Sequence, residues 1–326
     1  MKKIISLFLL ATLLVLSLAG CVSFKAPDKA PVRIGGLTGP TSIGLAKVMA
    51  DNAAGTSELA YDFTIAGAAD ELTPKIIKGE LDIAAVPANL AAVLYQRTNG
   101  AVQILAINTL GVLYMVQKGG EAINRFEDLR GKTIYATSKG TVTEYNLRYL
   151  LSQNGINPDQ DVTIEWKSEP AEVVATLKTA ESGIAMLPQP YVTVAQNNIP
   201  ELQVVLDLTA EWNSLDNGSQ MITGTLVVRK EYAEAHPQKI AKFLKEYEQS
   251  TNYVKANVEE AAAWVETYVG IKAPIAKKAI PYCNITFIAG EDMKAPLAAY
   301  LEILYSINPQ AVGGKLPDDA FYYVGK

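Results

Sequence analysis

Short apolar segments typical of strands alternate with helical patterns along most of this chain, and the alternation occurs twice. The run from Leu81 to Val86 is almost continuously apolar, as in a parallel strand that is covered on both faces. This rhythm predicts a doubly wound α/β lobe. In the first series we predict strands over 32–36, 61–65, 81–86 and 102–107, and helices from 41, over 71–78 and over 89–96.

The second series has the same organisation. Its predicted strands cover 132–136, 162–166, 183–187 and 202–206, and its predicted helices cover 141–154, 171–179 and 191–197. A strand over 226–229 can return to the first lobe, and the chain from Glu231 onward is predicted to be mostly helical. The fold class is therefore predicted to be α/β, a two-lobed clam shell in which helices flank each doubly wound sheet. Lobe I takes 31–109 and 223–326, and lobe II takes 110–222, with chain crossings near 109–112 and 220–223.

The first twenty residues have the pattern of a secretory signal. Lys2 and Lys3 precede an uncharged stretch, 4–18, that is short for a membrane span. The ending Leu-Ala-Gly-Cys21 resembles a bacterial lipobox, which implies cleavage before Cys21 and lipid on its sulfur. We predict a signal peptide over 1–20, a tether over 21–30 and an extracytoplasmic protein anchored to a bacterial membrane by its lipid.

Composition excludes several classes of site. The chain of 326 residues has one histidine, two cysteines and a net charge of -5, which argues against zinc sites, a disulfide framework and a nucleic-acid partner. Cys283 lies in an apolar context and is predicted to be a buried, inert thiol. His236 precedes a proline at a helix start and is predicted to lie at the surface or to cap the helix. We expect no catalytic residue, no metal and no cofactor.

Four turns rich in neutral hydrogen-bonding groups follow predicted strands. They are 37–42, 87–89, 137–141 and 188–191. In open α/β sheets ligands bind at the carboxyl ends of the strands, so these turns are candidates for one shared site. Ordinary helix capping, which also favours Ser, Thr and Asn, explains any one of them equally well.

Five stretches carry a resemblance to a known family. They are 18–21 (LAGC), 34–40 (IGGLTGP), 78–87 (KGELDIAAVP), 126–134 (FEDLRGKTI) and 185–193 (AMLPQPYVT). The chain resembles the substrate-binding proteins of ABC importers in the nitrate, sulfonate, taurine and thiamine-precursor group. The resemblance runs from about Pro31 through the C-terminal helices. It implies a periplasmic-binding-protein fold that closes on a small solute and delivers it to an ABC permease and its ATPase. We expect the protein to be a monomer.

The resemblance also implies the ligand-binding positions. On lobe I and the second crossing they are Thr38, Pro40, Thr41, Ser42, Asn89, Asn108 and Thr223. On lobe II they are Ser138, Gly140, Thr141, Gln189 and Tyr191. Gln189 stands where the family often has an acidic residue, which favours a neutral or anionic ligand group there.

Two ligand chemistries and three other functions stay open. Helix N-termini and hydroxyls suit a sulfonate or carboxylate. Asp70, Glu71, Trp212 and Tyr191 could instead receive a heteroaromatic ring, although a surface position is expected for Trp212. The other functions are a lipid-anchored sensor, a binding protein of an ion-gradient-driven importer and, with the weakest support, an enzyme of the same fold.

Overall fold

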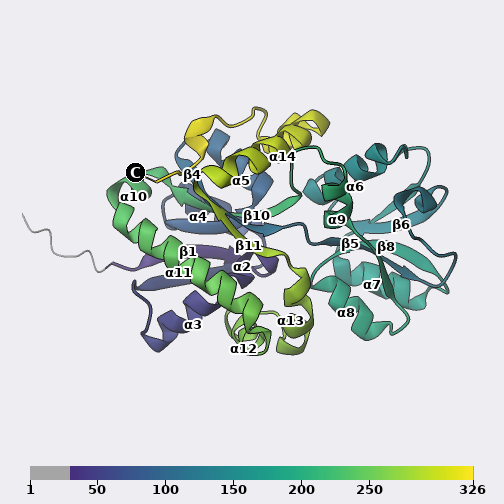
Figure 1. Cartoon of the computed structure of the whole chain (residues 1–326), viewed down its shortest axis with the longest axis horizontal. Coiled ribbons are helices and arrows are strands. Elements are labelled where there is room, and N and C mark those ends of the chain that lie inside the picture. Colours follow the sequence, from purple (N-terminus) through teal and green to yellow (C-terminus); the bar gives the residue numbers. More distant parts are fainter. Residues whose placement is uncertain (1–29, 326) are drawn as a thin grey trace, which may run out of the picture. The chain divides into compact units, whose positions relative to one another are not determined.

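A computed structural model of the chain describes residues 30–325. The predicted signal peptide, Cys21 and nearly all of the predicted tether lie outside the described residues. From Pro31 onward the chain forms one compact unit. It contains two mixed sheets flanked by helices, as Figure 1 shows. This arrangement confirms the predicted α/β fold class.

The first sheet has six strands in the order β11-β4-β10-β3-β1-β2. Strand β1 runs parallel to β2 and β3, whereas β10 runs antiparallel to both β3 and β4. The strand predicted over 226–229 is therefore part of this sheet, although it begins earlier, at Ile222. The bounds are β1 (Val32–Leu37), β2 (Tyr61–Ala66), β3 (Ile83–Pro87), β4 (Val102–Leu110), β10 (Ile222–Arg229) and β11 (Ile285–Ala289).

The second sheet has five strands in the order β7-β6-β8-β5-β9. Strand β6 is parallel to β7 and β8, and β5 is antiparallel to β8 and β9. The bounds are β5 (Leu113–Lys118), β6 (Thr133–Thr137), β7 (Thr163–Lys167), β8 (Gly183–Pro188) and β9 (Gln203–Asp207). The strands of the two sheets come from separate parts of the chain, but the lobe boundaries given above stay a prediction because the body is one compact unit.

Two strands were not expected from the sequence. Strand β5 begins only two residues after β4 ends. In the sequence its apolar residues therefore cannot be told apart from the predicted first crossing near 109–112. Strand β11 interrupts the region after Glu231 that we predicted to be mostly helical, and it pairs antiparallel with β4. It follows Asn284, whose positive φ of 44° marks a turn.

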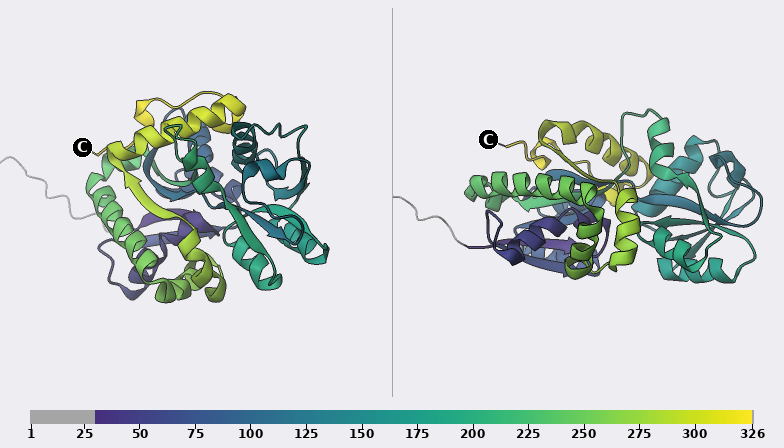
Figure 2. Two further views of the ribbon diagram at one scale, coloured as in Figure 1. Left: turned by 45° about the vertical axis from the view of Figure 1, so that its right-hand side comes forward. Right: turned by 60° about the horizontal axis from the view of Figure 1, so that its bottom comes forward.

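Helices flank both sheets (Figures 1 and 2). Within residues 30–325 no helix is long and apolar enough to cross a membrane. The α-helices are α2 (Pro40–Ile43), α3 (Ala46–Ala54), α4 (Ala69–Ile77), α5 (Ala88–Arg97), α6 (Val142–Gln153), α7 (Pro170–Thr179), α8 (Tyr191–Asn198), α9 (Leu208–Ser214), α10 (Lys230–Ala235), α11 (Pro237–Ala256), α12 (Val258–Trp264), α13 (Ala273–Ala279) and α14 (Lys294–Ile307).

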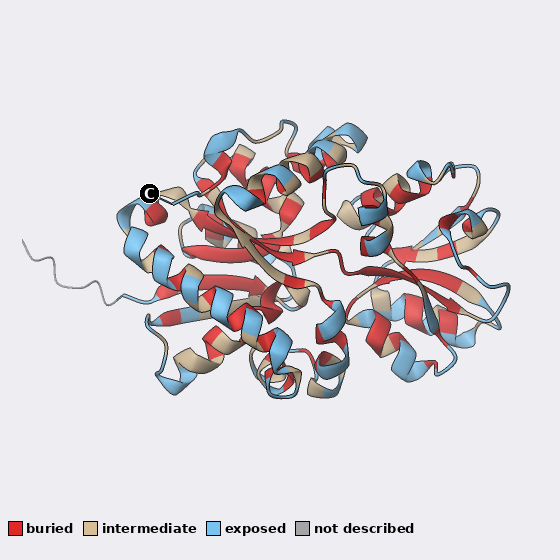
Figure 3. Ribbon diagram, in the orientation of Figure 1, coloured by how far each residue is buried: buried red, intermediate tan, exposed pale blue. Residues whose placement is uncertain are grey.

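The largest hydrophobic cluster is shared by both sheets. It includes Ile104 of β4, Met115 of β5 and Leu301 of α14, all of them buried. Figure 3 shows buried residues along the strands of both sheets and on the inner faces of the helices. Helix α14, from the C-terminal part of the chain, thus packs its apolar side chains against α6 and α9, which belong to the second series.

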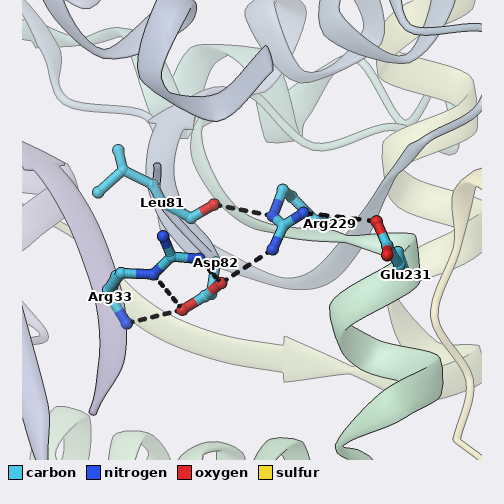
Figure 4. A network of polar contacts seen from close by, with 5 residues as sticks. All are labelled: Arg33, Leu81, Asp82, Arg229 and Glu231. Atoms are coloured by element: carbon cyan, nitrogen blue, oxygen red, sulfur yellow. Dashed lines mark hydrogen bonds and ion pairs between the residues drawn. The ribbon is translucent and has the colours of Figure 1, made fainter. Parts of the chain in front are cut away.

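A buried carboxylate, that of Asp82, links strands β1, β3 and β10 of the first sheet. Asp82, just before β3, accepts hydrogen bonds from the backbone N–H and the Nε of Arg33, both at 3.0 Å. It also accepts one from Nη2 of Arg229 at 3.1 Å (Figure 4). Arg33 lies near the start of β1 and Arg229 at the end of the antiparallel β10. The network therefore lies at the amino-terminal edge of the parallel strands, opposite the edge where their carboxyl-end turns meet.

Candidate ligand-binding site

A cavity of about 250 Å³ is lined by residues of both sheets and their connections. It lies at the carboxyl ends of β1 and β8, as expected for ligand sites in open α/β sheets. Its volume is below the roughly 300–1,000 Å³ of sites for drug-sized molecules, so it suits a smaller solute. The lining residues are Thr38, Gly39, Pro40, Val112, Leu113, Val142, Thr143, Asn146, Pro188, Gln189, Pro190, Tyr191, Ile222 and Thr223.

The lining is apolar with a few neutral polar groups. Val112, Leu113 and Ile222 form part of the apolar wall, and hydroxyls come from threonines and Tyr191. Among the described residues, no Asp, Glu, Lys, Arg or His lines the cavity. Recognition in this cavity therefore depends on shape and on neutral hydrogen-bonding groups.

Helices α6 and α8, like the short α2, begin at the cavity wall. Val142 and Thr143 open α6, whose N-cap Thr141 accepts a hydrogen bond from the N–H of Thr143. Tyr191 opens α8, directly after the Gln189–Pro190 bond, which is cis. The first N–H groups of a helix lack acceptors within the helix, and a helix N-terminus carries partial positive charge. Both features favour a ligand that presents oxygen acceptors.

Two buried carboxamides contribute further donors. The Oδ1 of Asn146 accepts a hydrogen bond from the Tyr300 hydroxyl at 3.1 Å, and the Oε1 of Gln189 accepts one from the Thr193 hydroxyl at 3.0 Å. Both amide side chains are buried, at 5% and 4% exposure, and both line the cavity. Each oxygen already accepts a hydrogen bond, whereas no hydrogen bond to another described residue uses either amide nitrogen, so the N–H groups are available to a ligand.

Five of the twelve predicted ligand positions line the cavity. Thr38, Pro40, Gln189, Tyr191 and Thr223 come from the first turn, the fourth turn and the second crossing. The structure thus brings residues of both predicted lobes to one cavity. Their role as ligand contacts remains a prediction.

The other seven predicted positions are not part of the lining, and most have structural contacts. Thr41 and Ser42 are buried beneath the first turn, and Asn108 donates to the Thr41 carbonyl oxygen at 2.9 Å. Asn89 donates to the carbonyl oxygen of Ala311 at 3.3 Å. The third turn is exposed: Ser138 and Gly140 have positive φ, and Thr141 caps α6.

Trp212 corrects one expectation. It was expected at a surface or, alternatively, against an aromatic ligand, yet it is fully buried and does not line the cavity. Its ring packs between Tyr149 and Tyr300, with centroids 4.7 and 5.6 Å away, and its Nε1 donates to the Ser219 hydroxyl at 2.8 Å. Trp212 therefore belongs to the core under α14.

Two further candidates for contacts with a heteroaromatic ligand, Asp70 and Glu71, are also not part of the cavity lining, whereas Tyr191 is. Asp70 and Glu71 are exposed at the start of α4, and Glu71 accepts hydrogen bonds from the N–H groups of Gly67 and Ala68. This is a helix-capping contact.

Cys283 and His236 occupy the kinds of position that the sequence predicts for them. Cys283 is confirmed as buried, and burial raises the pKa of its thiol to about 12, so the reactive thiolate is suppressed. His236 occupies the N-cap position of α11, as predicted, and its ring packs against Tyr232. Within residues 30–325, no cluster of three or more His, Cys, Asp or Glu could hold a metal ion.

The sequence analysis missed the part of α6 that borders the cavity. We expected ligand contacts in the turn that ends at Thr141, but the lining begins one residue later and includes Val142, Thr143 and Asn146. The signal available in the sequence was an amide, Asn146, between the apolar residues Tyr145 and Leu147 of the predicted helix; in the structure all three are buried. A buried polar side chain needs a partner or a function.

Comparisons with known proteins agree with this fold. The profile of the family described as NMT1/THI5 like matches residues 67–261, more than half of the chain. No curated protein sequence matches the chain. Among solved structures, an ABC transporter protein from Parabacteroides distasonis is similar at 21% identity and a TM-score of 0.75, covering 90% of this chain and 98% of that one.

Two similar structures have sulfonate-binding names. The periplasmic aliphatic sulphonate binding protein SsuA from Escherichia coli has 15% identity, a TM-score of 0.70, and coverage of 91% of this chain and 92% of its own. The alkanesulfonate-binding protein SsuA from Xanthomonas axonopodis pv. citri, bound to MOPS, has 14% identity, a TM-score of 0.62, and coverage of 89% and 95%. At these identities the likeness shows the fold alone.

Proposed function

The chain belongs to the NMT1/THI5-like family, and we propose that it is an extracytoplasmic solute-binding lipoprotein of an ABC importer. It captures a small organic molecule between its two sheets and delivers it, unchanged, to a membrane permease. The observation that carries this proposal is the cavity itself: it joins turns from both sheets and, among the described residues, holds neutral donors instead of ionised side chains.

Hinge closure is the proposed mechanism of capture. A ligand in the cavity contacts Thr38 and Pro40 on one side and Gln189 and Tyr191 on the other. Contacts with both sides exist together only when the two sides are close. The ligand therefore shifts the equilibrium toward the closed state by its differential affinity for the two states.

The proposed ligand is a small organic solute with a sulfonate-like group. The starts of α6 and α8 and the amides of Asn146 and Gln189 supply donors for its oxygens. A cationic heteroaromatic ring is a weaker candidate because, within the part of the chain that the structure describes, the lining contains no carboxylate and one aromatic residue, Tyr191. The names of the two sulfonate-binding proteins of similar fold support the same ligand class.

A thermal-shift panel tests the ligand class. The panel contains short alkanesulfonates, aminopyrimidines, sugars and divalent metal ions. We expect a rise in melting temperature with an alkanesulfonate, and recovery of that compound intact by mass spectrometry after release. A panel in which only sugars or metal ions raise the melting temperature contradicts the proposal, and chemical conversion of the ligand points to an enzyme.

Membrane anchoring is tested separately at Cys21. In bacterial cells fed a labelled fatty acid, the wild-type protein is expected to take up label and to fractionate with membranes. The Cys21→Ser variant is expected to do neither, whereas Cys283→Ser, which removes the buried thiol, retains both. Equal labelling of the wild type and Cys21→Ser contradicts the lipid anchor.

A further inference from the structure

The amide of Asn146 has one partner, and that partner lies on a distant helix. Asn146 is on α6, and the hydroxyl that donates to its Oδ1 belongs to Tyr300 of α14, 154 residues later in the chain. Tyr300 is fully buried and does not line the cavity. No hydrogen bond to another described residue uses Nδ2 of Asn146. Among the described residues, the hydrogen bond to Asn146 is the polar contact that links Tyr300 to the cavity lining.

The hydrogen bond from Tyr300 favours one of the two orientations of the Asn146 carboxamide over the other. A carboxamide turned by 180° has nearly the same shape but exchanges its acceptor oxygen for its N–H donors. With the oxygen toward α14, the Tyr300 hydroxyl has an acceptor for its proton. In the turned orientation N–H donors replace the acceptor that this proton uses, and leaving a buried donor unsatisfied is costly. Burial also raises the pKa of Tyr300, so its hydroxyl stays protonated and keeps a proton to donate.

A second amide of the same cavity is held in the same way. The Thr193 hydroxyl, itself only 3% exposed, donates to Oε1 of Gln189. Both cavity amides thus have the oxygen engaged by a buried hydroxyl that lies outside the lining, which leaves both amide nitrogens for the ligand.

We propose that Tyr300 is a positioning residue that fixes Asn146 as an N–H donor toward the cavity, and that it thereby selects ligands presenting oxygen acceptors. By the same argument, Thr193 is a positioning residue that fixes the orientation of the Gln189 amide. The inference rests on the proposed function in one respect, since it places the ligand in this cavity. It goes further by naming residues outside the site that decide which chemical group the site accepts.

Tyr300→Phe removes the hydroxyl and keeps the ring that packs against Trp212. With ethanesulfonate as the titrated probe, we expect this change to weaken binding about three- to tenfold, the effect of one hydrogen bond. Tyr305→Phe is the matched control, because Tyr305 lies on the same helix, outside the cavity lining. It should leave the affinity unchanged.

A double-mutant cycle separates positioning from a general structural effect. In an Asn146→Ala background, Tyr300→Phe is expected to cause no additional loss of affinity. An equal loss in both backgrounds overturns the inference, as does the absence of any loss in the wild-type background. Asn146→Asp keeps the size and the acceptor for Tyr300 but replaces the donor with an oxygen. If Asn146→Asp binds ethanesulfonate as tightly as the wild type, the inference is also wrong.

The orientation is also tested without any ligand. In protein labelled with ¹⁵N-asparagine, the Nδ2 pair of Asn146 is identified by its absence from the Asn146→Ala spectrum. We expect this pair to shift or broaden in Tyr300→Phe and not in Tyr305→Phe. An unchanged pair overturns the inference whether or not a solute binds. A protein that shows the expected change but binds no compound of the panel contradicts the proposed function and leaves the positioning of the amide in place.

Discussion

At the scale of single residues, the ion pairs of the buried Asp82 and the candidate site lie at opposite edges of the first sheet. Asp82 is 2% exposed and is held by two arginines at the amino-terminal edge of the parallel strands. The residues between 30 and 325 that line the cavity, at the carboxyl edge, are all neutral. The charged network therefore has a structural role, and the neutral cavity is the part of the molecule suited to binding.

Asp82→Asn is expected to destabilise the fold. The substitution removes the charge that satisfies Arg33 and Arg229, and hydrogen bonds to charged groups contribute about 1.5–3 kcal/mol each. Because both arginines are partly exposed, we expect a loss of about 1–3 kcal/mol in the free energy of unfolding, measured in urea. Asp70→Asn, an exposed change of the same type, should alter it by less than about 0.5 kcal/mol. Equal effects of the two changes would contradict the role of Asp82.

The same carboxylate predicts a dependence on pH. Burial alone would raise the pKa of Asp82, but hydrogen bonds from Arg33 and Arg229 outweigh it, and the pKa lies below its ordinary value. A lowered folded-state pKa stabilises the protein above the unfolded-state value of about 4, and this contribution is lost as the pH falls further. Urea unfolding between pH 6 and pH 3 should show a steeper loss for the wild type than for Asp82→Asn. Parallel curves would exclude this linkage.

The sequence predicted some cavity residues and missed others for a physical reason. Thr38 and Gln189 lie in turns after predicted strands, and the topology of an open α/β sheet brings such turns together. Asn146 lies inside a helix, where its burial depends on packing against Tyr300. No local pattern in the sequence reports a contact between residues so far apart.

At the scale of elements, helix α11 packs closely on the segment between α2 and α3. Ser250 of α11 donates to the Gly44 carbonyl oxygen at 2.6 Å, and the Tyr247 hydroxyl lies directly against Gly44. A Cβ at position 44 would meet that hydroxyl well inside van der Waals contact. Glycine is therefore required here by space, since its φ of -61° suits any residue.

Gly44→Ala is expected to cost about 1–3 kcal/mol of stability through overpacking. The cost should be smaller in a Tyr247→Phe background, where the nearest atom is absent. Gly67→Ala is a suitable control, because a Cβ there meets only the flexible end of Glu71. Denaturant unfolding of the wild type, the three single variants and the double variant measures these differences. An identical cost of Gly44→Ala in both backgrounds would show that the contact with Tyr247 is not its cause.

Most elements could be predicted because their apolar periodicity is local. The run over 81–86 and the strands around it were found within a few residues of their observed bounds. Strands β5 and β11 were missed because each is a short apolar run next to another element, and only pairing with β8 or β4 identifies it as a strand. Pairing partners of this kind are distant in the sequence.

At the scale of the whole molecule, the body from Pro31 has a core that continues across both sheets. Helix α14 contributes Tyr300, Leu301 and Leu304 to the cluster that also contains residues of β4 and β5. The clam-shell description from the sequence therefore omits one feature. The two sheets are joined by packing around α14 as well as by the two chain crossings.

This shared core predicts one cooperative unfolding transition. Scanning calorimetry of the protein should give a single endotherm, with a calorimetric enthalpy equal to the van't Hoff enthalpy. Two independent domains would give two transitions or a ratio well above one. Trp212→Ala, which removes a buried side chain under α14, should move the entire transition to lower temperature.

The position of a bound solute tests the central claim most directly. A crystal structure with the alkanesulfonate that stabilises the protein most should show it between the turn at Thr38–Pro40 and the turn at Pro188–Tyr191. Its oxygens should lie about 3 Å from Nδ2 of Asn146 and Nε2 of Gln189. Density for the solute in another part of the molecule, with this cavity unoccupied, would contradict the account.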